Sequence, residues 1–326
     1  MVRGCRRTAI LEELNLPLAR QVSDSIMGAM VPSEPDTNVP HQQVMLLDWE
    51  AGPLSYRCWR PVGRPRAVLV CVHGIGGHSL TFERLAEALV PHGYAIEALD
   101  LPGHGQSPGR RGAMKRWGEW RRAVLAFLAD VIARSPGIPC FLVGHSMGAT
   151  VVLDLALEAP QALPCLGVQG LILTNPGLDA AGVSRWRLLL ARLLSCLWPA
   201  FTLETGIADT AASRDPLVLA QRAADPWRHS CCSARLGSEF LATTARLRQA
   251  APRLHLPLVL LQSGADQVTP AAGAWRFFTA VGSADKTWRS YPESYHELYD
   301  DLDREQVFAD LLAWLERHVP VETAMD

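Results

Sequence analysis

Five continuous apolar runs, each separated from the next by a stretch of helical periodicity, constrain the fold of this chain more than any other feature. The runs read AVLVCVH, YAIEALD, CFLVGHS, VQGLILTN and LPLVLLQSG, at residues 67–73, 94–100, 140–146, 168–175 and 256–264. Strands that are apolar at every position are buried on both faces, and strands that alternate with helices form parallel sheets. The sequence therefore predicts an α/β fold with a mostly parallel sheet and helices on both faces.

The segment between the second and third runs illustrates the helices that we expect to cover the sheet. Its apolar residues recur every three or four positions, which places them on one helical face. They are Trp117, Trp120, Val124, Phe127, Leu128 and Val131. Upstream, VMLLDW and LSYRCWR flank a Gly-Pro turn, and this pattern predicts an antiparallel hairpin.

The strand and helix alternation also suggests how the chain is divided. It stops after Asp179 and resumes at Leu256, and the intervening segment has mostly helical patterns. The N-terminal residues lack strong periodicity and end in the Pro-rich VPSEPDTNVP. We expect an N-terminal arm, a first core part, an inserted helical cap and a second core part, at residues 1–40, 41–178, 179–250 and 251–326.

Charge and cysteine spacing exclude several classes of partner. The formal net charge of −2 gives no general attraction to nucleic acid. A basic run at residues 110–122 is interrupted by Trp117 and Trp120 at helical spacing, which favours a solvated helix face over a patch for anionic substrates or headgroups. The eight cysteines lack the paired spacing of a zinc site, so no metal is expected.

No targeting or membrane-spanning segment is expected. The N-terminal basic residues are followed by an acidic, broken stretch rather than the apolar core of a signal peptide. The most apolar stretch, residues 188–201, contains Arg192 and is shorter than the roughly 20 residues that span a bilayer. Cys71 and Cys140 lie inside apolar runs as buried thiols would, so we expect a cytoplasmic protein.

The strongest chemical motif is Gly144-His145-Ser146-Met147-Gly148, which lies between the apolar run CFLVGH and the helical ATVVLDLALE. This is the G-x-S-x-G nucleophile elbow in the strand–turn–helix setting that it requires. Its glycines permit a strained turn that exposes the serine hydroxyl, and the following helix directs amides toward negative charge. We therefore expect Ser146 to be a nucleophile.

A serine nucleophile needs a base, and the base needs an acid that orients it. In this fold the acid and then the histidine follow the serine along the chain. Asp266 follows the last apolar run, and His296 follows the strand-like TWRSYP, so we predict Asp266 as the acid and His296 as the base. The alternatives are Asp179 for the acid and His318, at the end of an amphipathic helix, for the base.

An acyl-transfer site also needs two amides for the developing oxyanion. The residue after the nucleophile and the loop after the first parallel strand supply them in this fold, which predicts Met147 and Ile75. The loop HGIGGH has the required glycines, and His73 is expected to brace it. The spacing does not complete a dinucleotide fingerprint, so no cofactor is expected.

Six short motifs are shared with a known group of enzymes. They are HGIGGHS, DLPGHGQSPG, GHSMG, SRDP, SGADQVTP and SYHEL. From about Val44 to His318 the chain resembles the monoacylglycerol lipase and lysophospholipase group of α/β-hydrolases. The resemblance implies an α/β-hydrolase fold with a cap, and a site whose triad and oxyanion donors are Ser146, Asp266, His296, Ile75 and Met147.

The chain departs from that group at three positions. Gly77 stands where the group usually has a glutamate, Thr81 where it often has an arginine, and Ala149 in place of a second glycine after the elbow. The first two changes remove polar groups near the expected alcohol-binding end. The sequence therefore leaves the identity of the alcohol open.

The predicted function is hydrolysis of a carboxylic ester of a long-chain acyl lipid, such as a monoacylglycerol or lysophospholipid, through an acyl-enzyme. Three alternatives stay open, since function depends on the site rather than the fold. They are a small-ester esterase, an aminopeptidase-like amidase with an acidic pocket, and a ligand-binding receptor on a hydrolase scaffold. Chain length and oligomeric state are not indicated.

One stretch of the expected cap, SRWRLLLARLLSCLWPAF at residues 184–201, is more apolar than a helix with a single buried stripe. Large exposed apolar patches mark contacts with partners, ligands or membranes. We expect Leu190 and Leu194 to bind the acyl chain at its entrance, with peripheral membrane contact through the cap. The alternative is that this segment is buried between cap and core or in a dimer.

Overall fold

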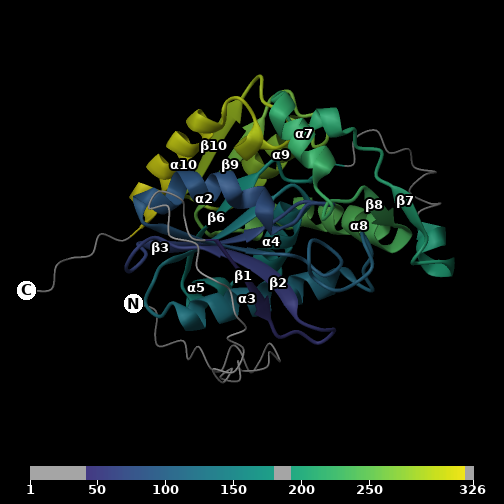
Figure 1. Cartoon of the computed structure of the whole chain (residues 1–326), viewed down its shortest axis with the longest axis horizontal. Helices are drawn as coiled ribbons and strands as arrows, with labels where there is room; N and C mark the ends of the chain where they lie inside the picture. The colour runs from purple at the N-terminus through teal and green to yellow at the C-terminus, as the bar shows by residue number, and fades with distance from the viewer. Residues whose placement is uncertain (1–41, 180–191, 320–326) are drawn as a thin grey trace, which may run out of the picture.

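The computed structural model describes residues 42–179 and 192–319. Within these residues one sheet has the strand order β1-β2-β4-β3-β5-β6-β9-β10. The sheet lies in the middle of the molecule, with helices around it (Figure 1). Its strands are β1 (Gln42–Leu47), β2 (Leu54–Trp59), β3 (Ala67–Val72), β4 (Tyr94–Leu99), β5 (Cys140–His145), β6 (Val168–Thr174), β9 (Leu258–Ser263) and β10 (Lys286–Tyr291). From β4 to β10 neighbouring strands run parallel, whereas β1–β2 and β2–β4 are antiparallel. The mostly parallel sheet and the antiparallel hairpin are therefore confirmed.

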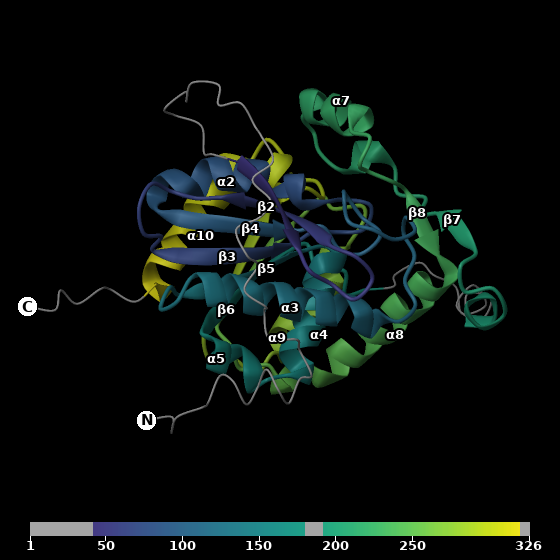
Figure 2. The same ribbon diagram turned by 60° about the horizontal axis from the view of Figure 1, so that its bottom comes forward.

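Helices cover both faces of this sheet, as predicted (Figure 2). One face packs against α3 (Trp117–Arg134), α4 (Met147–Glu158), α5 (Ala162–Leu166) and α9 (Ala271–Ala280). The other packs against α2 (Glu83–Leu89) and α10 (Arg304–His318). The six apolar residues that predicted the α3 face are all buried.

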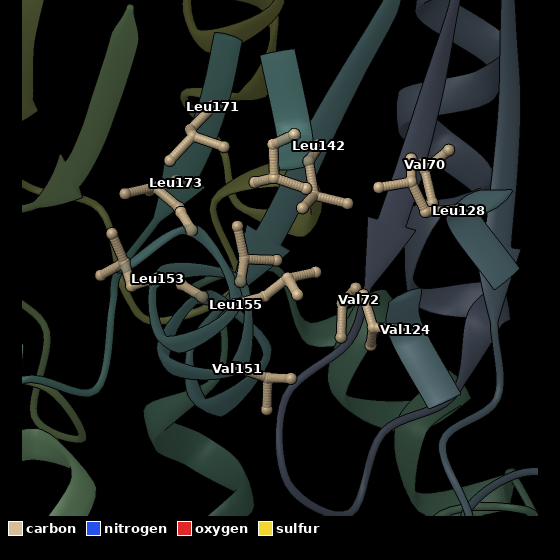
Figure 3. Packing of buried hydrophobic residues seen from close by; sticks show 14 of the residues in the cluster. Val70, Val72, Val124, Leu128, Leu142, Val151, Leu153, Leu155, Leu171 and Leu173 are labelled. Atoms are coloured by element: carbon tan, nitrogen blue, oxygen red, sulfur yellow. The ribbon is translucent and has the colours of Figure 1, made fainter. Parts of the chain in front are cut away.

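Successive side chains of β5 point to opposite faces of the sheet, and both faces are buried, which explains why its sequence is apolar throughout. Leu142 contributes to the core on the α3 and α4 side, whereas Phe141 and Val143 contribute to the core on the α2 and α10 side. Figure 3 shows the first of these cores, in which strand side chains meet those of α3 and α4. Because both faces of β5 are buried, its carboxyl end is held firmly where α4 begins.

The segment between β6 and β9 is less helical than the sequence predicts. It contains a small antiparallel sheet of β7 (Thr202–Glu204) and β8 (Cys231–Ser233) besides α7 (Pro216–Ala224) and α8 (Ala234–Ala250). Helix α8 packs against α3 and α4, and Arg246 of α8 forms an ion pair with the buried Asp154 of α4. The division into core and cap stays a prediction.

In the two described stretches of chain, no helix is both long and apolar enough to cross a membrane.

The core on the α4 side yields a stability prediction. Leu142 is 0% exposed, and truncation to alanine leaves a cavity between β5 and α4. We expect Leu142→Ala to lower the free energy of unfolding by about 2–5 kcal/mol. Leu302 is 56% exposed, and Leu302→Ala should change it by no more than about 0.5 kcal/mol. Urea denaturation followed by circular dichroism measures both, and equal losses would contradict this assignment of the core.

Candidate active site

The turn between β5 and α4 holds Ser146 in a conformation that few residues adopt. Its φ of 54° and ψ of −120° lie outside the regions that side chains favour. A Cβ at Gly144 would lie 2.5 Å from the Ala149 Cα, and one at Gly148 would overlap the Val72 carbonyl. Only glycine therefore fits on either side of the serine, which explains the spacing of the motif.

Ser146, His296 and Asp266 form a continuous hydrogen-bonded chain. The Ser146 Oγ lies 2.9 Å from the His296 Nε2, and the His296 Nδ1 lies 2.8 Å from the Asp266 Oδ2. Asp266 comes from the loop after β9, and His296 from the loop after β10. Parallel strands place their carboxyl ends at one edge of the sheet, so residues far apart in sequence meet there.

Hydrogen bonds keep Asp266 ionised. Its Oδ1 accepts from the amides of Val268 at 2.7 Å and Thr269 at 2.9 Å, and its Oδ2 accepts from the Thr269 hydroxyl at 2.7 Å. Burial by itself would raise the pKa of Asp266, but the hydrogen bonds from His296 and Thr269 outweigh it and the pKa is lowered. An ionised Asp266 accepts a hydrogen bond from the His296 Nδ1–H, so Nε2 carries no proton and can take the one from the Ser146 hydroxyl.

The two alternative residues lie elsewhere. Asp179 forms an ion pair with Arg276, and Arg248 lies 3.7 Å from its other carboxylate oxygen. At the end of α10, the His318 Nδ1 donates to the Trp314 carbonyl at 2.7 Å, and its Nε2 lies 2.9 Å from Asp285. Neither alternative forms a hydrogen bond or an ion pair with Ser146 or His296.

The loop after β3 lies directly against the serine. A Cβ at Gly74 would be 2.9 Å from the Ser146 Cβ, so this approach also requires glycine. The His73 Nδ1 donates to the Gly74 carbonyl at 2.7 Å, and its Nε2 accepts from the Leu101 amide at 3.0 Å. Burial lowers the pKa of His73 to about 4, so the ring is neutral and braces the loop.

Two amides near Ser146 are free to bind a ligand atom. Those of Ile75 and Met147 donate no hydrogen bond to any residue that the structure describes. Met147 is the first residue of α4, where a helix leaves its amides without acceptors. These are the two residues that the sequence predicts as oxyanion donors.

The segment between α7 and β8 also contacts the loop after β3, which the sequence did not indicate. The His78 Nε2 lies 2.7 Å from the Asp225 Oδ2, and the His229 amide donates to the Gly76 carbonyl at 3.1 Å. Gly76 has a φ of 68°, and a Cβ there would overlap the His229 carbonyl. This loop is therefore held from outside the sheet by residues about 150 positions away.

The neighbours of the serine and the histidine also bind each other. The His145 Nε2 lies 3.0 Å from the Glu297 Oε2, and the two rings of His145 and His296 are 4.9 Å apart. The Glu297 Oε1 accepts from Arg222 of α7 at 2.7 Å. Burial would raise the pKa of Glu297, but His145 and Arg222 outweigh it and hold that pKa well below its usual range.

Asn175 fixes the backbone of the histidine loop. It follows β6 with a φ of 44°, which asparagine tolerates better than most residues. Its Nδ2 donates to the His296 carbonyl at 2.6 Å and to the Ser263 Oγ at 2.8 Å. An asparagine followed by proline directly after a strand was the available signal in the sequence.

The predicted acyl-binding residues are only partly described. Leu190 lies outside the described residues. Leu194 is half-buried in the helical stretch 192–197. In the described parts of the chain, no cluster of three or more His, Cys, Asp or Glu side chains is arranged to hold a metal ion.

Comparison with known families gives one match over most of the chain. The profile of the family described as serine aminopeptidase, S33, matches residues 63–303. The chain is 31% identical to mouse monoglyceride lipase over 299 residues, which cover 89% of this chain and 96% of that protein. It is 29% identical to the monoacylglycerol lipase of Mycolicibacterium smegmatis over 268 residues, covering 82% and 94%.

Solved structures show the same architecture. The monoacylglycerol lipase of Paleococcus ferrophilus superimposes with a TM-score of 0.73 at 29% identity, covering 81% of this chain and 99% of that one. A soluble variant of the Saccharomyces cerevisiae monoglyceride lipase, solved with a substrate analogue, gives a TM-score of 0.76 at 24% identity, covering 89% and 99%.

The hydrogen bond between His296 and Asp266 yields a prediction about the acid. Asp266→Asn should leave a folded protein in which His296 carries its proton on the wrong nitrogen, so kcat on p-nitrophenyl acetate should fall by on the order of 10⁴-fold. Asp179→Asn is the control and should stay within about twofold. A large loss at Asp179 with near-normal Asp266→Asn would reassign the acid.

Proposed function

The chain belongs to the serine aminopeptidase S33 family of α/β-hydrolases and is a carboxylic ester hydrolase, and we propose that Ser146 cleaves the ester of a monoacylated lipid through an acyl-enzyme. One contact carries this proposal, namely the 2.9 Å between the Ser146 Oγ and the His296 Nε2. A serine hydroxyl is a weak nucleophile unless a base within hydrogen-bond reach takes its proton.

In the acylation step, the Ser146 Oγ attacks the ester carbonyl carbon while His296 Nε2 takes the hydroxyl proton. The carbonyl oxygen becomes an oxyanion, and the amides of Ile75 and Met147 donate to it. Asp266 stabilises the imidazolium through Nδ1. As the tetrahedral intermediate collapses, the bond to the alcohol oxygen breaks and His296 returns its proton to that oxygen.

In the deacylation step, water takes the place of the serine hydroxyl as the nucleophile. His296 takes a proton from the water as its oxygen attacks the acyl carbonyl carbon, and the same two amides stabilise the oxyanion. The bond to the Ser146 Oγ then breaks, and His296 returns the proton to the serine. The products are the free carboxylic acid and the regenerated enzyme.

Charge pairing around the site supports an ester over a peptide with a free amino terminus. An aminopeptidase needs a free carboxylate to bind the substrate ammonium group. Among the described residues beside His296, Asp266 binds His296 itself and Glu297 binds Arg222 and His145. Asp300 lies 2.9 Å from Arg84. The nearby carboxylates are therefore already neutralised.

The proposed substrate is a lipid because of the relatives and of the apolar surface of the cap. The similar proteins include monoglyceride and monoacylglycerol lipases. Within residues 192–203, which we assign to the cap, Leu193, Leu197, Trp198 and Leu203 are all more than half exposed. An apolar group of this kind suits contact with a membrane, with Trp198 at the boundary. We propose that the acyl chain enters beside Leu194.

The thiols support a cytoplasmic location. Cys58, Cys71 and Cys140 are free and buried in the core. Burial raises the pKa of each of these thiols, which keeps them protonated and unreactive. Free thiols in the core are typical of proteins in a reducing compartment.

The assigned nucleophile and base predict the effect of removing them. Ser146→Ala should abolish labelling by a fluorophosphonate probe and lower kcat on acyl esters by roughly 10⁶-fold, because no other group forms the acyl-enzyme. His296→Ala should cause a comparable loss. His318→Ala is the control and should retain kcat within about twofold. Retained turnover by Ser146→Ala, or exchanged effects of the two histidines, would refute the assignment.

The exposed apolar side chains of the cap predict that their removal slows hydrolysis of long-chain esters more than hydrolysis of short-chain esters. Leu197 and Trp198 are 75% and 62% exposed, so serine at both should weaken binding to phospholipid vesicles about tenfold or more without unfolding the protein. Turnover of long-chain esters should fall, and turnover of short-chain esters should not. Leu302→Ser, at another exposed leucine, is the matched control. Equal losses on both substrates would show that the segment is structural.

A further inference from the structure

The Arg228 guanidinium is half-buried, lies beside the histidine loop and has no hydrogen-bond acceptor among the described residues. Its side chain is only 17% exposed. Among the residues that the structure describes, its guanidinium donates no hydrogen bond, and it forms an ion pair with the Glu297 Oε1 at 3.5 Å. A guanidinium carries five N–H donors, so this arginine has most of its binding capacity unused.

The neighbouring carboxylates are already bound to other groups. The Glu297 Oε1 accepts from Arg222 at 2.7 Å, and its Oε2 lies 3.0 Å from His145. Asp225 binds His78 at 2.7 Å and the Trp227 amide at 2.9 Å. Burial, followed by repulsion from Arg222, lowers the pKa of Arg228 despite the attraction of these carboxylates. Neither carboxylate accepts a hydrogen bond from the Arg228 guanidinium.

Arg228 lies on the side of the histidine loop where we expect the leaving alcohol of the substrate. His296 must return its proton to the departing alcohol, so that oxygen lies at the His296 Nε2. Glu297, the residue after His296, is the ion-pair partner of Arg228. On its other side, His229 donates its amide to Gly76 of the oxyanion loop. Arg228 thus lies between the histidine loop and the oxyanion loop.

The facing part of the oxyanion loop offers no competing negative charge. Gly77 has no side chain, and a Cβ there would lie 3.3 Å from the Thr81 Oγ1. That hydroxyl is buried and has no hydrogen-bond partner among the described residues. At this end of the site, the Arg228 guanidinium and the Thr81 hydroxyl both lack a hydrogen-bond partner among the described residues, and position 77 carries no carboxylate.

We propose that Arg228 binds an anionic group on the leaving alcohol, so that the favoured substrates are acyl esters whose alcohol carries a phosphate. The proposal rests on the ester hydrolysis proposed for Ser146. A planar guanidinium binds phosphate oxygens in pairs, which gives both orientation and affinity. Only the acyl C–O bond breaks, and the phosphorylated alcohol departs with the proton from His296 and its phosphate intact.

The test compares two esters that differ in one group, 1-decanoylglycerol 3-phosphate and 1-decanoylglycerol, both below their critical micelle concentrations. The measured quantity is the ratio of kcat/KM on the phosphorylated ester to that on the neutral one. In Arg228→Met this ratio should fall by about 10- to 100-fold, the worth of a charge-assisted hydrogen bond to a buried ion. Arg228→Lys keeps the charge without the paired donors and should give an intermediate ratio.

Arg248→Met is the matched control. Arg248 lies on α8, is 40% exposed and faces Asp179 rather than Glu297, so its removal should leave the ratio unchanged. The inference is wrong if the wild type prefers the neutral ester, or if Arg228→Met and Arg228→Lys hydrolyse both esters with an unchanged ratio. It is also wrong if inorganic phosphate inhibits the wild type but not Arg228→Met while the ratio stays the same, since Arg228 would then bind free phosphate.

Failure of the proposed ester hydrolysis can be distinguished from failure of the role of Arg228. If neither ester is hydrolysed and a fluorophosphonate does not label Ser146, the ester hydrolysis and the role of Arg228 both fall. If the neutral ester is hydrolysed and Ser146 is labelled, an unchanged ratio removes the role of Arg228 alone.

Discussion

The strained turn at Ser146 is the constraint on which the rest of the site depends. A residue with a φ of 54° persists only where its surroundings leave no alternative. Here β5 is buried on both faces, and α4 starts so close to the sheet that Gly148 lies against the Val72 carbonyl. The close packing of the parallel sheet against α4 therefore supplies the energy that keeps the hydroxyl presented to the histidine.

Around that turn, the site is held by pairs of residues from distant segments. The neighbours of the serine and the histidine, His145 and Glu297, bind each other, and Arg222 reaches the same carboxylate from α7. Asn175 holds the backbone of the histidine loop. Because these contacts are buried and charged or fully hydrogen-bonded, each of them restricts the catalytic groups more than a surface contact would. The segment that we assign to the cap thus contributes to the geometry of the site.

The sequence by itself determined the architecture and identified the reactive residue types. Continuous apolar runs such as 140–146 specify buried parallel strands, because no exposed strand tolerates that composition. The glycines around Ser146 indicate an elbow because a tight strand-to-helix turn excludes side chains. Chain order then pointed to Asp266 and His296, which the structure brings within 2.9 Å of their hydrogen-bonding neighbours. These features are local or follow from burial, so they can be read along the chain.

Only the tertiary structure decided which distant side chains meet at the site. The pairing of His145 with Glu297 depends on how the sheet brings the ends of β5 and β10 together. The positions of Arg222 and Arg228 depend on how the segment between β6 and β9 folds. That segment has mostly helical patterns in the sequence, yet it also contains a small antiparallel sheet. Ion pairs between residues that are far apart in the chain, such as Arg222 and Glu297 at 75 positions, leave no periodic signal, because their energy comes from burial and distance rather than from local sequence.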